Sequence, residues 1–191
     1  MARERRIDFH PGVVPSNRTG SSVDSLVERI REDALARGHD LFLFGAACFW
    51  SPESEFRLIP GVIAKAVGFS GGHVAEPNYY TVCNGNTGHA EVVLVEFDPA
   101  VISYSELVDA FFAAHDASHW EKDYQYRSAI FVYDDAQSAV AERTVETRRA
   151  RGHKVKTEVT DATAFWPAED YHQQYYEKRG LAKPVGKPGL F

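Results

Sequence analysis

The sequence predicts one α+β domain in which helices pack on one side of a mixed β-sheet. Apolar strand-like runs alternate with segments at helical spacing, in the central order strand–helix–strand–strand–helix–strand, followed by a further helix and strand. This order is the split βαβ pattern. A length of 191 residues suits a single domain, and neither an internal repeat nor a linker interrupts it.

The N-terminal part differs in composition from the rest of the chain. Residues 1–20 are polar and broken by Pro and Gly, which predicts an extended segment. Helical spacing of apolar residues predicts a helix over 23–38 that Gly38 ends. We therefore expect an N-terminal extension with one helix over 1–40 and a catalytic α+β domain over 41–191.

The remaining elements are bounded by Gly, Pro, Ser and Asp. Strands are expected over 41–46, 62–69, 91–97, 128–133 and 155–159. Helices are expected over 51–59, 103–116, 136–151 and 168–178. Residues 73–88 show no periodicity and predict a long ordered loop, which in a compact domain usually serves function.

Composition excludes several classes of partner. A net charge of -6 and a pI near 5.7 disfavour nucleic acid and anionic membranes. No stretch approaches the roughly 20 apolar residues that span a bilayer, and the charged N-terminus does not resemble a signal peptide. Only two cysteines occur, which fits a reducing, cytoplasmic setting.

Cys48 is the first candidate for chemistry. It follows the strand over 41–46 and precedes a helix, where unpaired N–H groups and the helix dipole stabilise a thiolate. Phe49 and Trp50 place apolar surface beside it. The second cysteine, Cys83, lies in the polar loop; it could resolve an oxidised Cys48 or be structural, because no spacing forces the two together.

Glu91 is a second candidate, because it opens an apolar strand. A carboxyl that is partly desolvated at such a position has a raised pKa and stays protonated near neutral pH. An exposed glutamate at a strand end is the alternative interpretation.

Two other patterns suggest different chemistry. Ser70 lies in a G-x-S-x-G sequence, the nucleophile elbow of serine hydrolases, but the residues after it do not begin a helix. His115 and His119 have the spacing of two metal ligands on a helix, yet no further ligand completes a zinc site. We therefore predict no metal and no bound cofactor.

Four motifs together give the chain a family resemblance. They are Cys-Phe-Trp at 48–50, Thr-Gly-His-Ala-Glu at 87–91, Gln-Tyr-Arg-Ser at 125–128 and Ala-Glu-Asp-Tyr-His-Gln at 168–173. In this set and order the chain resembles the A-type peptide methionine sulfoxide reductases. The similarity runs from about residue 41 to about residue 178.

The resemblance implies a ferredoxin-like two-layer sandwich that reduces the S-epimer of methionine sulfoxide, free or in oxidised proteins. It implies that Cys48 attacks the sulfoxide sulfur, that protonated Glu91 with Tyr79 and Tyr126 assists the oxygen, and that a sulfenic acid forms on Cys48. Phe49 and Trp50 would hold the S-methyl group. His172 and Tyr175 match supporting positions.

The chain departs from the family in ways that bear on activity. The glycines that flank the motif are Ala47 and Ser51 here, and the segment 117–124 is shortened. Residues 180–186 lack the resolving cysteines that many members carry in a C-terminal tail. We therefore expect an external thiol reductant (thioredoxin, glutaredoxin or glutathione) to attack Cys48 directly, with Cys83 as the second hypothesis. A non-catalytic relative that binds sulfoxide or senses oxidants is the alternative function.

Overall fold

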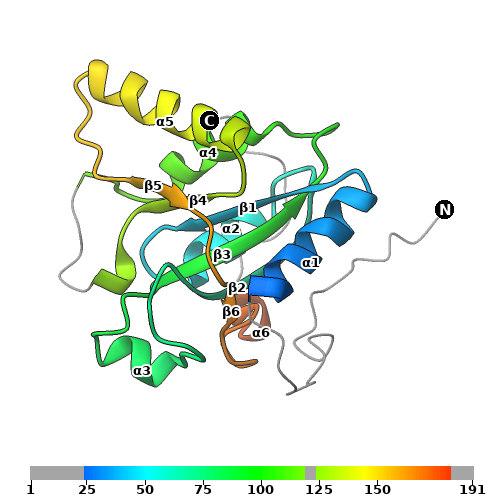
Figure 1. Cartoon of the computed structure of the whole chain (residues 1–191), viewed down its shortest axis with the longest axis vertical. Helices are drawn as coiled ribbons and strands as arrows, with labels where there is room; N and C mark the ends of the chain where they lie inside the picture. Colours follow the sequence, from blue (N-terminus) through cyan, green and yellow to red (C-terminus); the bar gives the residue numbers. More distant parts are fainter. Residues whose placement is uncertain (1–23, 119–123, 182–191) are drawn as a thin grey trace.

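The computed structural model describes residues 24–118 and 124–181, which form a six-stranded sheet with helices around it (Figure 1). The strand order is β5-β4-β1-β3-β2-β6, and every neighbouring pair is antiparallel except β4 and β5. The strands are β1 (Asp40–Gly45), β2 (Val62–Ser70), β3 (Ala90–Phe97), β4 (Ala129–Val132), β5 (Glu158–Asp161) and β6 (Trp166–Pro167).

The helices lie mainly where the sequence predicts them. They are α1 (Asp24–Ala36), α2 (Trp50–Phe56), α3 (Tyr79–Cys83), α4 (Tyr104–Ala114), the 3₁₀ turn η2 (Tyr124–Tyr126), α5 (Asp135–Ala150) and α6 (Tyr175–Lys178). The four central strands β4-β1-β3-β2, with α2 and α4 as crossovers, make the ferredoxin-like core. The predicted fold class is thus confirmed, and the parallel β4–β5 pair makes the sheet mixed.

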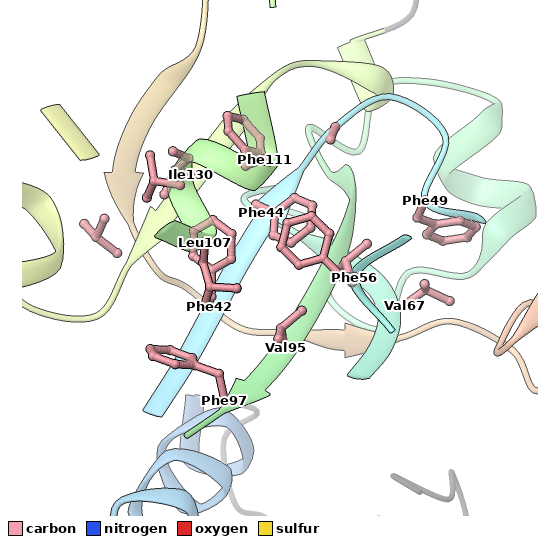
Figure 2. Packing of buried hydrophobic residues seen from close by; sticks show 14 of the residues in the cluster. Phe42, Phe44, Phe49, Phe56, Val67, Val95, Phe97, Leu107, Phe111 and Ile130 are labelled. Atoms are coloured by element: carbon pink, nitrogen blue, oxygen red, sulfur yellow. The ribbon is translucent and has the colours of Figure 1, made fainter. Parts of the chain in front are cut away.

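One face of the sheet carries an aromatic core beneath α2 and α4 (Figure 2). The rings of Phe42 and Phe44 on β1 stack with centroids 4.9 Å apart. Phe56 of α2 lies 4.5 Å from Phe44, and Phe111 of α4 meets Phe44 edge-on at 5.6 Å. Because rings of this size bury large apolar areas, this face supplies most of the hydrophobic stabilisation.

The opposite face of the sheet is also covered. Leu41 and Leu43, which alternate with Phe42 and Phe44 along β1, pack with Val27 and Ala34 of α1. The predicted two-layer sandwich therefore has α1 added on its second face. Residues 1–23 lie outside the described part of the chain, so the division at residue 40 stays a prediction.

Two predicted elements differ from the structure. The expected loop over 73–88 contains the short helix α3, which begins with a capping box between Asn78 and Thr81. The helix expected over 168–178 is reduced to α6, because Gln174 adopts a left-handed backbone with φ 54°. The strand β6 and the later start of β5 were also not predicted.

Among residues 24–118 and 124–181, no helix has the length and apolar character needed to cross a bilayer.

Candidate active site

The sheet brings three predicted site residues together at one end of its inner strands, where β1 ends and β3 and β4 begin. Phe44 on β1 pairs with Val93 on β3, and Gly45 pairs with Ala129 on β4. Cys48 follows β1, while Glu91 is the second residue of β3 and Tyr126 precedes β4. The Phe49 N–H, next to Cys48 in the chain, donates to Glu91 Oε2 at 3.2 Å.

Cys48 is half-buried and immediately precedes the first turn of α2. Burial raises the pKa of its thiol to about 11, although a hydrogen bond from the Trp50 backbone opposes the shift and the nearby Glu91 carboxylate adds to it. The predicted thiolate stabilisation by the helix start is therefore outweighed in the resting site, and Cys48 rests as a thiol. Attack requires a group that takes the thiol proton.

Glu91 is 1% exposed, and burial raises the pKa of its carboxyl to about 7. The Phe49 N–H lowers this pKa by a smaller amount, and no described cation offsets the burial. Because a pKa near neutral lets one group both give and accept a proton, Glu91 can serve as a general acid and then as a base. Glu91 is thus buried at the start of β3, as the first interpretation predicts, and the interpretation as an exposed glutamate at a strand end is wrong.

Two phenols and the second thiol lie within electrostatic range of Glu91 or Cys48. Burial raises the pKa of Tyr126 to about 12, with a further contribution from the Glu91 charge. Burial also raises the pKa of Tyr79, and a hydrogen bond between its hydroxyl and the Cys83 sulfur adds to this. Both phenols therefore remain protonated donors at neutral pH.

Cys83 is exposed and ends α3, four residues after Tyr79 on the same helix. The Gln125 side-chain amide lies 3.8 Å from its sulfur. Cys83 also makes a small electrostatic contribution to the raised pKa of Cys48, so the two thiols lie within electrostatic range of each other. The fold thus brings together two cysteines that sequence spacing alone did not connect.

Trp50 is held by a column of side chains from the C-terminal segment. The indole ring of Trp50 stacks on the ring of Tyr175, with the centroids 3.7 Å apart and an angle of 7° between the ring planes. The Arg179 guanidinium lies 3.7 Å from the centroid of the Tyr175 ring. The indole Nε1–H donates to His172 Nδ1 at 3.2 Å. Trp50 is half-buried, whereas Phe49 is 1% exposed and packs on Phe69 at 6.0 Å.

The segment 168–174 is held against the sheet by side chains rather than by a helix. The Gln173 amide accepts from Val67 N–H at 2.9 Å and donates to Val67 C=O at 2.8 Å and to Ala168 C=O at 2.9 Å. The buried Glu53 carboxylate accepts the Gln174 N–H at 2.9 and 3.0 Å. These bonds satisfy backbone groups that have no partner in a helix or strand. They also hold the segment in the place where His172 contacts Trp50.

The comparisons with known proteins agree with this geometry. The family model described as peptide methionine sulfoxide reductase matches residues 40–184. The peptide methionine sulfoxide reductase MsrA of Acinetobacter baumannii is 45% identical over 141 residues, 71% of this chain and 82% of that protein. The chain belongs to the peptide methionine sulfoxide reductase family.

Solved structures agree with the assignment. Mxr1 from Saccharomyces cerevisiae in reduced form has a TM-score of 0.70 and 30% identity, and the match covers 79% of this chain and 92% of Mxr1. Mxr1 in complex with Trx2 matches with a TM-score of 0.53 and 25% identity over 73% of this chain and 86% of Mxr1. The fold of this reductase family member is therefore shared with proteins whose structures include reduced and partner-bound forms.

The family motif at 125–128 connects the site to β5. Arg127 is 3% exposed and pairs with Glu158 at 3.2 Å, while its guanidinium lies 4.0 Å from the Tyr124 ring. Ser128 shares hydrogen bonds with Thr157 at 2.8 Å and with His115 at 2.7 Å. Arg127 and Ser128 therefore hold the turn that presents Tyr126, whereas Gln125 approaches Cys83.

The departure at Ala47 has a structural consequence. Ala47 has φ 60°, a left-handed conformation in which glycine carries no steric cost. A glycine at this position would adopt the same backbone conformation without that cost. Here the alanine stores about 1 kcal/mol of strain directly before Cys48.

Ser70 of the hydrolase pattern and His115 of the zinc pattern make hydrogen bonds with residues other than Cys48 and Glu91. Ser70 is 0% exposed and its hydroxyl donates to Ala164 C=O at 3.0 Å. His115 bonds to Phe111 C=O at 2.9 Å and to the Ser128 hydroxyl. His119 lies outside the described residues, within which no group of three metal-ligating side chains occurs.

Proposed function

We propose that this protein reduces the S-epimer of methionine sulfoxide through Cys48, with Glu91 as the proton donor. The observation that carries the proposal is the buried Glu91 carboxyl, whose pKa is raised to about 7 and which is joined to the Cys48 turn through the Phe49 N–H. A sulfoxide oxygen leaves only when it is protonated. A neutral carboxylic acid beside a thiol meets this need.

The proposed first step is balanced in protons and electrons. The Cys48 sulfur bonds to the sulfoxide sulfur, the Glu91 proton passes to the sulfoxide oxygen, and the thiol proton passes to the Glu91 carboxylate. The hydroxyl group then moves to the Cys48 sulfur as the bond between the two sulfurs breaks. Methionine leaves with two more electrons on its sulfur, and Cys48 becomes a sulfenic acid.

The substrate contacts follow from the arrangement of the site. Tyr79 and Tyr126 supply neutral O–H donors on the side of Glu91, where the sulfoxide oxygen would lie. The half-buried Trp50 offers apolar surface for the S-methyl group, and the buried Phe49 supports it from below. His172 and Tyr175 position Trp50 rather than contact the substrate.

For the return to the thiol, we propose that Cys83 resolves the sulfenic acid, in place of direct attack by an external thiol. The Cys83 sulfur is hydrogen-bonded to the Tyr79 phenol, which in this proposal faces the oxygen that ends on Cys48. Attack of the Cys83 thiol on the sulfenic sulfur forms a disulfide and releases water. Cys83 is exposed, so an external thiol can then open that disulfide.

We propose a thiol reductant of the thioredoxin class, which the Mxr1–Trx2 structure of the yeast relative supports. Glutaredoxin and glutathione are the alternatives. An assay with each reductant in turn distinguishes them.

The experiment uses the fact that the chain has two cysteines. One equivalent of S-sulfoxide, added without reductant, should release one methionine and remove both titratable thiols. Cys83→Ser should release the same methionine but end as a sulfenic acid, and Cys48→Ser should release none. A wild-type protein that makes no methionine would instead favour the non-catalytic binder or sensor. Persistence of the Cys83 thiol in the wild type after turnover would restore direct external attack.

A further inference from the structure

On the turn that supports Trp50, two buried polar atoms have no hydrogen-bond partner among residues 24–118 and 124–181. They are His172 Nε2 and Glu169 Oε2. The two residues lie on one turn, and the His172 N–H donates to Glu169 C=O at 2.8 Å. Buried polar groups left unpaired are costly, so their occurrence on this turn calls for a role.

The tautomer of His172 follows from its contacts. Its Nδ1 accepts the Trp50 indole N–H, which can only donate. His172 is 2% exposed, and burial lowers its pKa although the Glu169 charge opposes this. The imidazole is therefore neutral, and its proton is on Nε2. The unpartnered atom of His172 is a donor.

The free oxygen of Glu169 is the complementary acceptor. Its other oxygen, Oε1, accepts the Tyr79 N–H at 3.0 Å at the first residue of α3. The ring of Tyr79 lies 4.3 Å from that of His172. The turn from Glu169 to His172 therefore contacts both Tyr79 and Trp50. In the proposed function, Tyr79 faces the sulfoxide oxygen and Trp50 faces the S-methyl group.

We propose that Glu169 and His172 form one positioning unit, in which a single water joins the His172 Nε2–H to Glu169 Oε2. The unit sets the distance between Tyr79 and Trp50, and so between the two recognised ends of the sulfoxide group. It rests on the proposed function of those two residues. Neither member touches the substrate.

Variants that mimic one nitrogen at a time test the histidine. His172→Asn keeps an acceptor near Nδ1 for the indole, whereas His172→Gln keeps a donor near Nε2 and loses that acceptor. We expect His172→Gln to raise the KM for methionine sulfoxide about fivefold, the effect of one neutral hydrogen bond, with kcat nearly unchanged. His172→Asn should raise it less.

Variants of Glu169 test the link. Glu169→Gln keeps the acceptor for Tyr79 N–H but faces the Nε2–H with a second donor, so KM should rise with kcat retained. Glu169→Ala should also lower kcat about tenfold, because Tyr79 loses its anchor. The exposed neighbour change Asp170→Asn is the control and should match the wild type.

Titration of active Cys48 separates positioning from misfolding, since a smaller folded fraction lowers the apparent kcat and leaves KM constant. The proposal is overturned if His172→Asn, which loses the Nε2 donor, has the KM of the wild type, or if both Glu169 variants behave like Asp170→Asn. Those results leave the proposed function intact. Failure of the wild type to form methionine is the separate result that removes it.

Discussion

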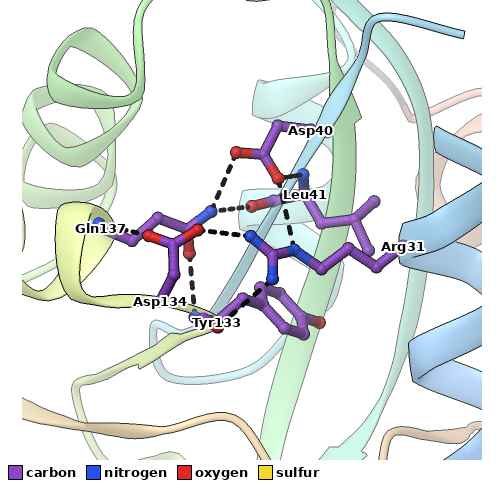
Figure 3. A network of polar contacts seen from close by, with 6 residues as sticks. All are labelled: Arg31, Asp40, Leu41, Tyr133, Asp134 and Gln137. Carbon is purple, nitrogen blue, oxygen red and sulfur yellow. Dashed lines mark hydrogen bonds and ion pairs between the residues drawn. The ribbon is translucent and has the colours of Figure 1, made fainter. Parts of the chain in front are cut away.

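Two buried glutamines fasten opposite ends of the molecule, in different surroundings. Gln173 bonds the backbone of β2 beside the aromatic residues of the site. Gln137 bonds Leu41 C=O and Tyr133 N–H at the far end of β4, within a charged network of Arg31, Asp40 and Asp134 (Figure 3).

The difference concerns where charge is allowed. Arg31 and Asp134 of the far network line a cavity of about 600 Å³, and the carboxylates of Asp40 and Asp134 have a cationic partner in Arg31. At the site, the Glu91 carboxyl is buried and has no such partner among residues 24–118 and 124–181. Both glutamines use the side-chain amide to bind backbone groups. At the far end of the sheet, the amide of Gln137 serves stability. At the other end, the amide of Gln173 holds the site without bringing a cation that would ionise Glu91.

The largest effect is expected on the activity of glutamine variants, where Gln173 and Gln137 should differ. Gln173→Ala leaves three buried backbone groups without this partner and should cost about 3 kcal/mol of unfolding free energy. Gln137→Ala should cost a similar amount. In urea denaturation the two should therefore look alike, but only Gln173→Ala should lower kcat/KM of the folded enzyme by tenfold or more. Equal activity of the two variants would contradict a site-specific role for Gln173.

Replacing the buried Glu91 carboxyl by an amide is the next test. Because the folded-state pKa of Glu91 is about 7 against 4.5 for the ordinary group, the folded protein holds this proton more tightly. Its contribution to stability is present below pH 4.5 and falls as pH rises to 7. Glu91→Gln should thus be more stable than the wild type above pH 7, by up to about 3 kcal/mol.

Activity should change in the opposite direction. Glu91→Gln should lose a factor of about 10² or more in kcat, the usual size of general acid catalysis. The wild-type rate should decline as pH rises above about 7, where Glu91 gives up its proton. A stability gain that is independent of pH would show that ionisation of Glu91 is not its source.

Ala47→Gly gives a smaller effect. It removes the left-handed strain before Cys48, and we expect about 1 kcal/mol of added stability, reduced by the larger entropy of glycine in the unfolded chain. Thermal denaturation measures it. The matched change at Gln174, φ 54°, to Gly tests whether the gain is a general property of left-handed positions.

The smallest effect is expected in the far network. Arg31→Ala removes ion pairs of partly exposed side chains and should cost about 0.5 kcal/mol. High salt should reduce the difference from the wild type, since it screens the same charges. A cost that does not depend on salt would assign the effect to the packing of Arg31 on the Tyr133 ring instead.

The sequence was sufficient for the fold class because β1, β3 and α4 have clear apolar patterns and turn residues. It failed at residues 168–174, where Gln173 and Glu53 replace helical hydrogen bonds with side-chain bonds that no periodicity reveals. Cys48 and Glu91 were predicted as candidates from their positions at the ends of elements, and the structure places both where β1 ends and β3 begins. The contribution of Cys83 depends on α3, whose single turn is too short to give a pattern.

Glu169 was missed for a related reason. It lies within a family motif, but its partner Tyr79 is far away in the chain, and the contact exists only after β6 has paired with β2. The pKa of Cys48 was predicted in the wrong direction because the helix start is visible in a sequence, whereas desolvation by neighbouring elements is not.

The hydrogen bond between Trp50 and His172 spans 122 positions of sequence. During synthesis, the ferredoxin-like strands β1 to β4 are complete before residues 166–175 leave the ribosome. A nascent chain can therefore carry a folded sheet and an exposed Cys48 while Trp50 still lacks its supports. Until residues 166–175 are available, Trp50 lacks the contacts with His172 and Tyr175 that position it near Cys48.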